Sequence, residues 1–315
     1  MNDISTVFVT GGLGFIGSHL VDRLIDEEYD VIVLDDFSSG LESNVSQIRN
    51  PKLRVVRGSV LDTKVLADCM KNADAVVHLA AIVSVQRSLS EPHLTHDVNV
   101  TGTLNLLSEG VRQRVRKFIF ASSAAVYGRS ENLPLREEYP VNPLSPYGAS
   151  KAAAEAYCTA FSKSMQMDTV ILRFMNVYGP RRSSSQYAGV MIKFAEAVRK
   201  GDPLVIYGDG QQTRDFTYVT DIVDAMILSL KSKTDSGVPM NIGTGKPHTI
   251  NQLARIFEEI GGLSVQRRFM NERPGEIRSS YGDITLARQS IGYQPKVELA
   301  EGVRRFMEWY RTKAN

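Results

Sequence analysis

Apolar residues in the first half of the chain fall into short runs separated by longer stretches with a helical pattern. The runs span residues 6–10, 31–34, 53–56, 75–79, 117–121 and 169–172. Most lack the strict alternation of a strand with one wet face, as expected for strands covered on both faces. Helical patterns lie between them, for example at 15–27 and 94–114. This alternation predicts an α/β fold built on a doubly wound parallel (Rossmann) sheet with right-handed crossovers.

The pattern changes after residue 180, where turns become more frequent. The elements expected here are a serine-rich loop at 181–186, a helix to 200, a turn-rich segment at 207–215, a helix at about 221–231, a strand at 239–243, a helix near 249–260 and an amphipathic tail at 298–311. We interpret this half as a smaller C-terminal α/β lobe, with the helix at 219–230 returning to the first domain. The expected division is residues 1–175 with 217–240 for the first domain, and 176–216 with 241–315 for the lobe.

Composition narrows the class of protein without defining its chemistry. Hydrophobic content of 43% and charged content of 23% are ordinary for a soluble globular chain. A formal net charge of +2 argues against a nucleic-acid binder. Cys69 and Cys158 form no CxxC pattern and indicate neither a disulfide framework nor a metal site, so we expect two buried, reduced thiols. Neither a signal peptide nor a membrane-spanning run is apparent, and we expect a cytoplasmic protein.

The glycines of the run at 10–17 follow the first strand and open the first helix. In this context Gly11 permits a tight turn, Gly14 allows the backbone to approach a pyrophosphate, and Gly17 allows close packing of helix on sheet. Asp35 and Asp36 end the second strand, where an acid binds the ribose of a dinucleotide. A carboxylate there repels a 2′-phosphate, so NAD is favoured over NADP. The alternative for Asp35 is a turn or helix-cap aspartate.

Tyr147 and Lys151 stand four residues apart in a segment with a helical pattern, which places both on one face. An ammonium beside a phenol favours the phenolate and lowers the phenol pKa. A tyrosine tuned in this way can take a proton from a sugar hydroxyl. Ser122 and Ser123 end the fifth strand at the ligand-binding edge of the sheet, where Ser123 can relay that proton. The alternatives are a surface lysine with a half-buried tyrosine, and serines that only form a turn.

Two other polar residues are ambiguous. Asn99 lies in a helical pattern that disfavours asparagine, so it is either a surface residue or one that hydrogen-bonds backbone near the cofactor. His78 ends the fourth strand, and we expect it to be a structural core residue with no metal cluster around it.

Together these motifs resemble the extended short-chain dehydrogenase/reductase superfamily, and within it the nucleotide-sugar 4-epimerases of the UDP-glucose and UDP-N-acetylglucosamine type. The resemblance covers nearly the whole chain and includes the segments at 78–81, 173–181, 212–221 and 273–278. It implies an NAD-binding first domain and a substrate-binding lobe. It also implies a homodimer through the helices at 94–114 and 147–164, whose apolar positions are equally compatible with an internal core.

The resemblance also assigns residues to ligands. The dinucleotide would contact Gly11, Gly14, Phe15, Ile16, Gly17, Asp35, Asp36, Ser59, Val60, Leu79, Ala80, Ala81, Asn99, Ser122, Tyr147, Lys151 and Phe174. The UDP-sugar would contact Ser84, Ser123, Tyr147, Asn176, Val190, Tyr207, Arg214, Arg273, Glu276 and Ser280. Guanidinium groups at Arg214 and Arg273 suit a diphosphate because they bind phosphate oxygens bidentately. The chain departs from the family at Ser59, where an aspartate is usual, at Met175 and at Glu276.

The residue after Ser123 bears on the reaction. Relatives that dehydrate or decarboxylate the sugar carry an acid there, whereas this chain has Ala124. We therefore expect 4-epimerisation by transient oxidation at C4, with Ser123, Tyr147 and Lys151 as the catalytic group and no metal. The alternatives are a UDP-uronate 4-epimerase, a 4-keto-sugar reductase and a non-catalytic NAD-binding scaffold or sensor. The intact catalytic group argues against a scaffold.

Two serines bear on the choice of sugar. Epimerases restricted to unacetylated sugars tend to carry a tyrosine three residues before the position of Asp283, where this chain has Ser280. Ser84 matches a serine of relatives that accept N-acetyl groups. We expect room for UDP-N-acetylglucosamine; the alternative is that Ser280 is a plain loop serine.

Overall fold

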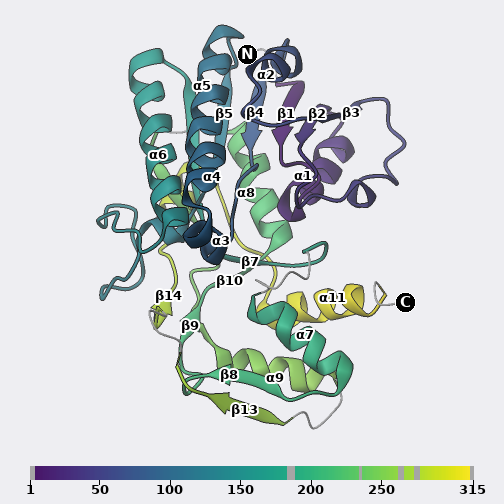
Figure 1. Ribbon diagram of the computed structural model, residues 1–315, viewed down its shortest axis with the longest axis vertical. Coiled ribbons are helices and arrows are strands. Elements are labelled where there is room, and N and C mark those ends of the chain that lie inside the picture. The colour runs from purple at the N-terminus through teal and green to yellow at the C-terminus, as the bar shows by residue number, and fades with distance from the viewer. Residues whose placement is uncertain (1–3, 183–188, 234–235, 262–265, 273–276, 313–315) are drawn as a thin grey trace.

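The computed structural model describes residues 4–182, 189–233, 236–261, 266–272 and 277–312 (Figure 1). A seven-stranded sheet forms its larger part, in the order β11-β6-β5-β4-β1-β2-β3, and all neighbouring strands are parallel. The strands are β1 (Thr6–Thr10), β2 (Asp30–Asp35), β3 (Leu53–Arg57), β4 (Ala75–His78), β5 (Lys117–Ser123), β6 (Asp168–Phe174) and β11 (Pro239–Ile242). The predicted doubly wound α/β fold is confirmed.

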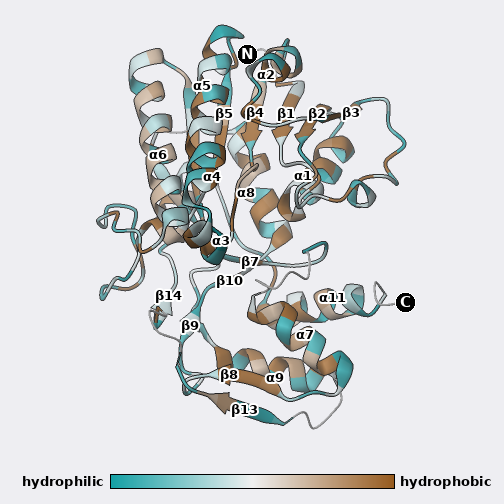
Figure 2. Cartoon of the chain, in the orientation of Figure 1, coloured by the Kyte–Doolittle hydropathy of each residue, from teal (hydrophilic) through white to brown (hydrophobic). Residues whose placement is uncertain are grey.

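Helices cover both faces of this sheet. On one face, α1 (Phe15–Asp26) packs against α8 (Val219–Lys231), and their apolar side chains join one core cluster with those of the strands. On the other face, α2 (Thr63–Met70), α5 (Gly102–Arg112) and α6 (Pro146–Met165) form a second cluster. Figure 2 shows the hydrophobic strands between these helices. Cover on both faces explains why the strand sequences are almost continuously apolar.

The helical stretch predicted at 94–114 is one rod with an internal irregularity. After α3 (Val85–Ser90), it begins with α4 (Pro92–His96), passes through a π-helical turn (Asp97–Thr101) and continues as α5. Such a turn inserts extra backbone into a helix and often lies next to a functional site. Here it carries Asn99.

The smaller lobe lies below the sheet in Figure 1. Its core is formed by α7 (Val190–Lys200), α9 (Ile250–Gly261) and α11 (Leu299–Thr312), together with β8 (Leu204–Tyr207), which pairs with β13 (Arg267–Met270). Short strands connect the lobe to the sheet: β7 (Asn176–Tyr178) pairs with β10 (Phe216–Tyr218), and β9 (Thr213–Arg214) lies between β12 (His248–Thr249) and β14 (Ser279–Ser280).

The chain returns to the large sheet twice after entering the lobe. Helix α8 packs on α1 and β5, as expected for the segment at 219–230. Strand β11 runs to Ile242 beside β6, so the expected boundary at residue 240 falls inside a strand of the sheet. Helix α10 (Thr285–Ile291), expected in the lobe, packs on β11 and α8 and contributes Ala287 and Ile291 to the core of the sheet. Strand β11 and helix α10 are too short for their hydrophobic pattern to indicate which of the two cores they join.

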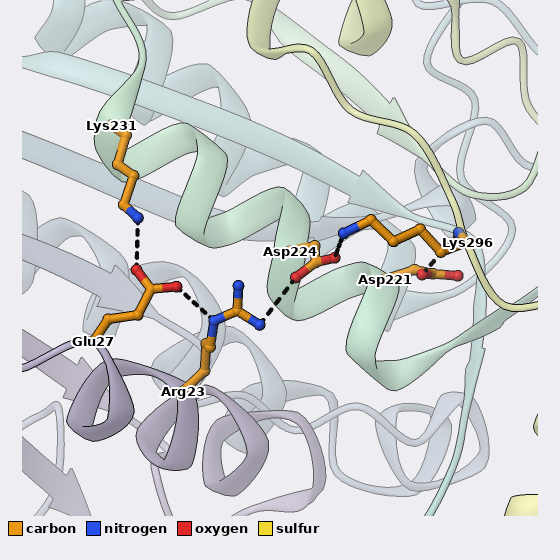
Figure 3. Close-up of polar contacts among 6 residues, drawn as sticks. All are labelled: Arg23, Glu27, Asp221, Asp224, Lys231 and Lys296. Carbon is orange, nitrogen blue, oxygen red and sulfur yellow. Dashed lines mark hydrogen bonds and ion pairs between the residues drawn. The ribbon is translucent and has the colours of Figure 1, made fainter.

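Ion pairs join α8 to α1 and to the segment before α11 (Figure 3). Glu27 pairs with Arg23 at 2.5 Å and with Lys231 at 2.6 Å, which links α1 to the end of α8. Asp224 pairs with Arg23 at 3.5 Å and with Lys296 at 2.7 Å. The segment that leads into α11 is therefore held against α8.

Candidate active site

A cleft of about 800 Å³ lies at the carboxyl edge of the large sheet and is lined from both lobes. Its lining comes from the ends of β1, β2, β4 and β5, the first turns of α1, α6 and α7, and β7. Open α/β sheets bind ligands at this edge, where the strand order reverses. The volume suits a ligand of dinucleotide or sugar-nucleotide kind.

The glycine turn forms the floor of the cleft. Gly11 has φ +70°, and a Cβ there would lie 2.8 Å from the backbone nitrogen of Ala80. A Cβ on Gly17 would lie 2.1 Å from the carbonyl oxygen of Gly11, so α1 packs against the turn as only glycine allows. Gly14 precedes α1, and no side chain of the described residues caps the first N–H groups of this helix. These N–H groups, with Phe15 and Ile16 beside them in the lining, fit a pyrophosphate.

Asp35 closes the second strand at one end of the cleft. Its Oδ2 accepts a hydrogen bond from the Leu13 N–H at 3.0 Å, and its Oδ1 accepts one from the Phe37 N–H at 2.9 Å. Burial raises the pKa of Asp35, against the effect of these two bonds. Each carboxylate oxygen keeps one free acceptor position. Asp35 can therefore stabilise this turn and also accept hydrogen bonds from ribose hydroxyls. Asp36 also lines the cleft and binds the Ser38 N–H at 2.9 Å.

The remaining residues expected at the dinucleotide divide into two groups. Those that line the cleft are Ser59, Val60, Leu79, Ala80, Ala81, Ser122, Tyr147, Lys151 and Phe174. Asn99 is buried outside the lining, where its Oδ1 accepts from the Ile82 N–H at 2.8 Å and its Nδ2 donates to the Ser150 hydroxyl at 2.9 Å. Of its two possible roles, the structure shows hydrogen bonding to backbone, which ties the loop after β4 to α6.

His78 is a core residue. Its Nδ1 lies 2.7 Å from Thr10 Oγ1 and its Nε2 lies 3.0 Å from Thr103 Oγ1. Burial lowers the pKa of His78 to about 3, so the ring is neutral and does not act as an acid at physiological pH. Throughout the described ranges, no group of three or more His, Cys, Asp or Glu residues could hold a metal ion, and both cysteines are buried and free. No helix in those ranges is long and apolar enough to cross a membrane.

Helix α6 places the tyrosine and lysine. Its N-cap Ser145 accepts from the Gly148 N–H at 3.1 Å, and Pro146 provides the fixed φ suited to a first helical position. Tyr147 and Lys151 both line the cleft, and Ser123 lies beside the phenol from the end of β5. The three residues predicted as a catalytic group are therefore together.

The electrostatics differ from the sequence-based expectation. Burial raises the pKa of Tyr147, while the Ser123 hydroxyl and the Arg182 guanidinium act in the opposite direction. The expected charge from Lys151 is directed elsewhere: its Nζ donates to the Ala121 carbonyl at 2.8 Å and lies 4.8 Å from the centre of the Phe120 ring. Burial lowers the pKa of Lys151 to about 8. Helical spacing predicts a shared face but not the direction of a four-carbon side chain.

A buried ion pair supports this end of the cleft. Ser122 Oγ donates to Glu155 at 2.5 Å, and Glu155 accepts from Arg173 at 2.9 and 2.7 Å. The Ser122 hydroxyl therefore uses its one proton in a hydrogen bond to the buried Glu155. Sequence reasoning missed Glu155, although its place one helical turn after Lys151 was a usable signal.

Most residues expected at the sugar nucleotide line the same cleft. These are Ser84, Ser123, Tyr147, Asn176, Val190, Arg214 and Ser280. Ser280 pairs with Arg214 in the register of β14 and β9, and Ser84 caps α3 by accepting from the Arg87 N–H at 3.1 Å. Tyr207 ends β8 and is not part of the described lining. Arg273 and Glu276 lie outside the described residues.

Three arginines of the lining were not predicted as site residues: Arg87, Arg181 and Arg182. Arg87 is paired with Glu91 at 3.1 Å, and Arg181 with Asp22 at 2.6 Å. The Arg-Arg pair directly after the segment 176–180 was visible in the sequence, but nothing in its pattern showed that both arginines line the cleft.

Parallel sheet, glycine turn and the cluster of Ser123, Tyr147 and Lys151 define an extended short-chain dehydrogenase/reductase. The family model described as GDP-mannose 4,6 dehydratase matches residues 8–306, and the chain belongs to this family. The chain is 39% identical to a putative UDP-glucose 4-epimerase of Methanocaldococcus jannaschii. The alignment covers 97% of this chain and 98% of that relative.

Two solved structures extend the comparison. The UDP-N-acetylglucosamine 4-epimerase of Methanobrevibacter ruminantium, in complex with UDP-N-acetylmuramic acid, matches with a TM-score of 0.94 and 39% identity, over 99% of this chain and 100% of that one. The UDP-glucuronic acid 4-epimerase of Bacillus cereus, in complex with UDP-glucuronic acid and NAD, matches with a TM-score of 0.91 and 31% identity, over 98% of this chain and 99% of that one.

Proposed function

We propose that this protein is an NAD-dependent 4-epimerase of UDP-hexoses, acting on UDP-glucose and UDP-galactose and also on their N-acetylated counterparts. NAD, when bound, supplies reversible hydride acceptance from C4 of the sugar. Tyr147 takes the proton of the C4 hydroxyl, with Ser123 bridging between the two oxygens, and returns it after the 4-keto sugar has turned over in the cleft. The fold, the cleft and the NAD complex of the Bacillus cereus relative support this proposal.

The chain's own residues fit NAD. The uncapped start of α1 faces where a pyrophosphate would lie, and Asp35 keeps acceptor positions for ribose hydroxyls. Lys151 and Tyr147 both line the cleft from α6, and Lys151 would hold the nicotinamide ribose there. The negative charge of Asp35 favours NAD over NADP.

The observation that carries the choice of reaction is the distribution of carboxylates. Among the described residues that line the cleft, only Asp35 and Asp36 are acids, and both lie at the end of β2. Glu155 is buried behind Ser122 and bound to Arg173. Dehydration needs a proton donor for the departing hydroxyl, and none of the described acids stands beside Ser123 or Tyr147. Oxidation and re-reduction at C4 would need the hydride chemistry of NAD and one proton acceptor, the role proposed for Tyr147, but no carboxylic acid.

A panel assay tests this function. Purified protein is denatured to measure released NAD(H), and native protein is incubated with UDP-glucose, UDP-N-acetylglucosamine and UDP-glucuronate separately, with products followed by NMR. We expect bound NAD and a mixture of 4-epimers from the first two sugars. Turnover of the uronate alone would favour the uronate epimerase, and net consumption of reduced cofactor would favour the reductase. Bound NAD without turnover of any sugar would favour the scaffold.

We also propose a homodimer through the helices that carry exposed apolar residues. Leu89 on α3, Leu94 on α4 and Tyr157 on α6 are exposed. These helices contact one another, and α4 and α6 belong to the segments at 94–114 and 147–164 through which the resemblance implies a homodimer. Sedimentation of the purified protein tests this state, and a monomer at micromolar concentration would contradict it.

A further inference from the structure

Strand β5 ends at the cleft in three successive residues, and two of them are hydrogen-bonded to α6. The Ala121 carbonyl accepts from Lys151 Nζ at 2.8 Å, and the Ser122 hydroxyl donates to Glu155 at 2.5 Å. Ser123, the third, lines the cleft as the residue proposed to bridge the sugar hydroxyl and the base. The place of Ser123 is therefore set by backbone that these two bonds hold against α6.

The partners on α6 belong to the same row of side chains as the proposed base. Tyr147, Lys151 and Glu155 follow one another at intervals of four residues, so they lie along one face of the helix. Tyr147 lines the cleft, and the other two side chains are bound to β5. A rotation or slide of α6 that moved the phenol would therefore break both bonds.

Arg173 fixes the Glu155 carboxylate from the neighbouring strand. It lies opposite Ser122 in the register of β5 and β6. Its guanidinium donates to the two Glu155 oxygens at 2.9 and 2.7 Å. It also donates to the Glu137 carbonyl at 3.2 Å and lies 4.7 Å from the centre of the Tyr127 ring. A guanidinium held by a fork of two bonds and an aromatic face keeps one orientation, so Glu155 is a rigid acceptor for the serine.

A gain in stability is a weak explanation for this ion pair. The Glu155 and Arg173 side chains are 6% and 4% exposed. A pair so deeply buried loses much of its hydration, and apolar side chains of similar volume are often equally stabilising. What apolar side chains cannot supply is an acceptor for the Ser122 hydroxyl.

We propose that Glu155 and Ser122 are positioning residues that lock the end of β5 to α6, so that Ser123 and Tyr147 meet at the sugar hydroxyl. This inference rests on the proposed 4-epimerase function. It assigns the Ser122 hydroxyl to this anchor and not to the dinucleotide contact that the resemblance implies. The anchor takes no part in the transfer of proton or hydride and sets only the geometry in which they occur.

Paired substitutions separate positioning from stability. Ser122→Ala removes the hydroxyl at the cleft end of the contact between α6 and the sheet and leaves the ion pair. Thr169→Val is the matched control, because the buried Thr169 hydroxyl, near the start of β6, donates to the Cys158 carbonyl of α6 at 3.1 Å. A strand–helix bond of the same kind is then lost at the opposite edge of the sheet. A double variant, Glu155→Met with Arg173→Met, removes the acceptor without leaving a buried charge unpaired.

The readouts are kcat and KM for UDP-glucose, NAD released per chain, the Tm, and the NMR signal of the Tyr147 Cζ in protein with isotope-labelled tyrosine. Tyr147→Phe assigns this signal. We expect Ser122→Ala to lower kcat about tenfold and to keep KM and bound NAD within about twofold, because a small misplacement of reacting groups costs rate more than binding. The Tyr147 signal should shift. Thr169→Val should lower the Tm to a similar extent and leave kcat and the Tyr147 signal unchanged.

A cycle of variants tests the route from Glu155 to the cleft. If Glu155 acts through Ser122, adding Ser122→Ala to the double methionine variant lowers kcat no further. A further loss overturns this route. If the double methionine variant fails to fold, Glu155→Gln takes its place.

Three results would overturn the proposal as a whole. These are a wild-type kcat in Ser122→Ala, an equal loss of kcat in Thr169→Val, and a loss of bound NAD in Ser122→Ala, which would make the serine a ligand of the dinucleotide. A wild-type protein inactive on every UDP-sugar would remove the proposed function. The Tyr147 signal would still decide the positioning role, since a shift in Ser122→Ala supports it and an unshifted signal overturns it.

Discussion

The hydroxyl of Tyr147 is the only group that distinguishes this side chain from phenylalanine, so its removal tests the phenol and leaves the ring in place. We predict that Tyr147→Phe lowers epimerisation by about 10²- to 10⁴-fold, the usual contribution of a positioned acid–base group. The dinucleotide should stay bound because the glycine turn and Asp35 are untouched. The measurement is turnover of UDP-glucose together with NAD released on denaturation. Near-normal turnover would show that Tyr147 is not the base.

Ser280 offers a test of sugar choice. Its side chain lines the cleft from β14, next to Arg214 in the register. We predict that Ser280→Tyr removes activity on UDP-N-acetylglucosamine and leaves that on UDP-glucose within a few-fold, because the loss is steric. The check is kcat/KM for both sugars in wild type and variant. Wild-type protein that ignores the acetylated sugar would contradict the open pocket.

At the scale of single residues, the sequence predicts which side chains line the cleft, because the motifs lie at strand ends and on one face of a helix. It does not predict where flexible side chains point. Lys151 turns to the Ala121 carbonyl, and Ser122 turns to Glu155. Both orientations depend on partners from other elements that are brought close only by folding.

At the scale of elements, one carboxylate fixes the start of β1. Asp74 accepts from the Ser5 N–H at 2.8 Å and the Thr6 N–H at 2.9 Å, and it pairs with Arg116 at 2.6 Å. Burial disfavours its charge, but these bonds outweigh burial and bring the pKa of Asp74 to about 2, below its ordinary 3.8. Its contribution to stability is therefore complete above about pH 4 and is lost as the pH falls through about 2.

We predict that Asp74→Asn lowers the Tm at pH 7 by about 2–4 °C, since hydrogen bonds to a charged group contribute about 1.5–3 kcal/mol. The difference from wild type should shrink as the pH falls below about 4. Thermal unfolding from pH 7 to pH 3 measures it. Glu196→Gln, which removes an exposed carboxylate, is the control and should change the Tm little. A difference that grows toward low pH would contradict the assignment.

The long elements were predictable and the short ones were not. Strands β1, β2, β4, β5 and β6 carry nearly continuous apolar runs because helices cover both faces of the sheet, and that signal is local, whereas the edge strand β3 is largely exposed. Strand β11 and helix α10 carry the same kind of residues in segments of four and seven. Which core they enter is decided by β6 and α8, which are distant in the sequence.

At the scale of the whole molecule, no single cleavage of the chain separates all of the large sheet from the lobe. We predict that a fragment of residues 1–232 does not unfold cooperatively, because it lacks β11 and leaves β6 as an open edge. It also lacks Met240, Ile242 and Tyr293, which are buried in the core of the sheet. Circular dichroism melting and amide NMR dispersion test this. A sharp melt with dispersed signals would show that the first domain stands alone.

The late return of β11 and α10 also has a consequence for synthesis. Domains made from one continuous segment can fold as they leave the ribosome, N-terminal part first. Here β11 is made only after α7, β8 and α8, and α10 only after α9 and β13, so the nascent sheet keeps the edge of β6 unpaired while the first part of the lobe is synthesised. An unpaired strand edge is a site of aggregation, so yield should depend on chaperones that hold the nascent chain.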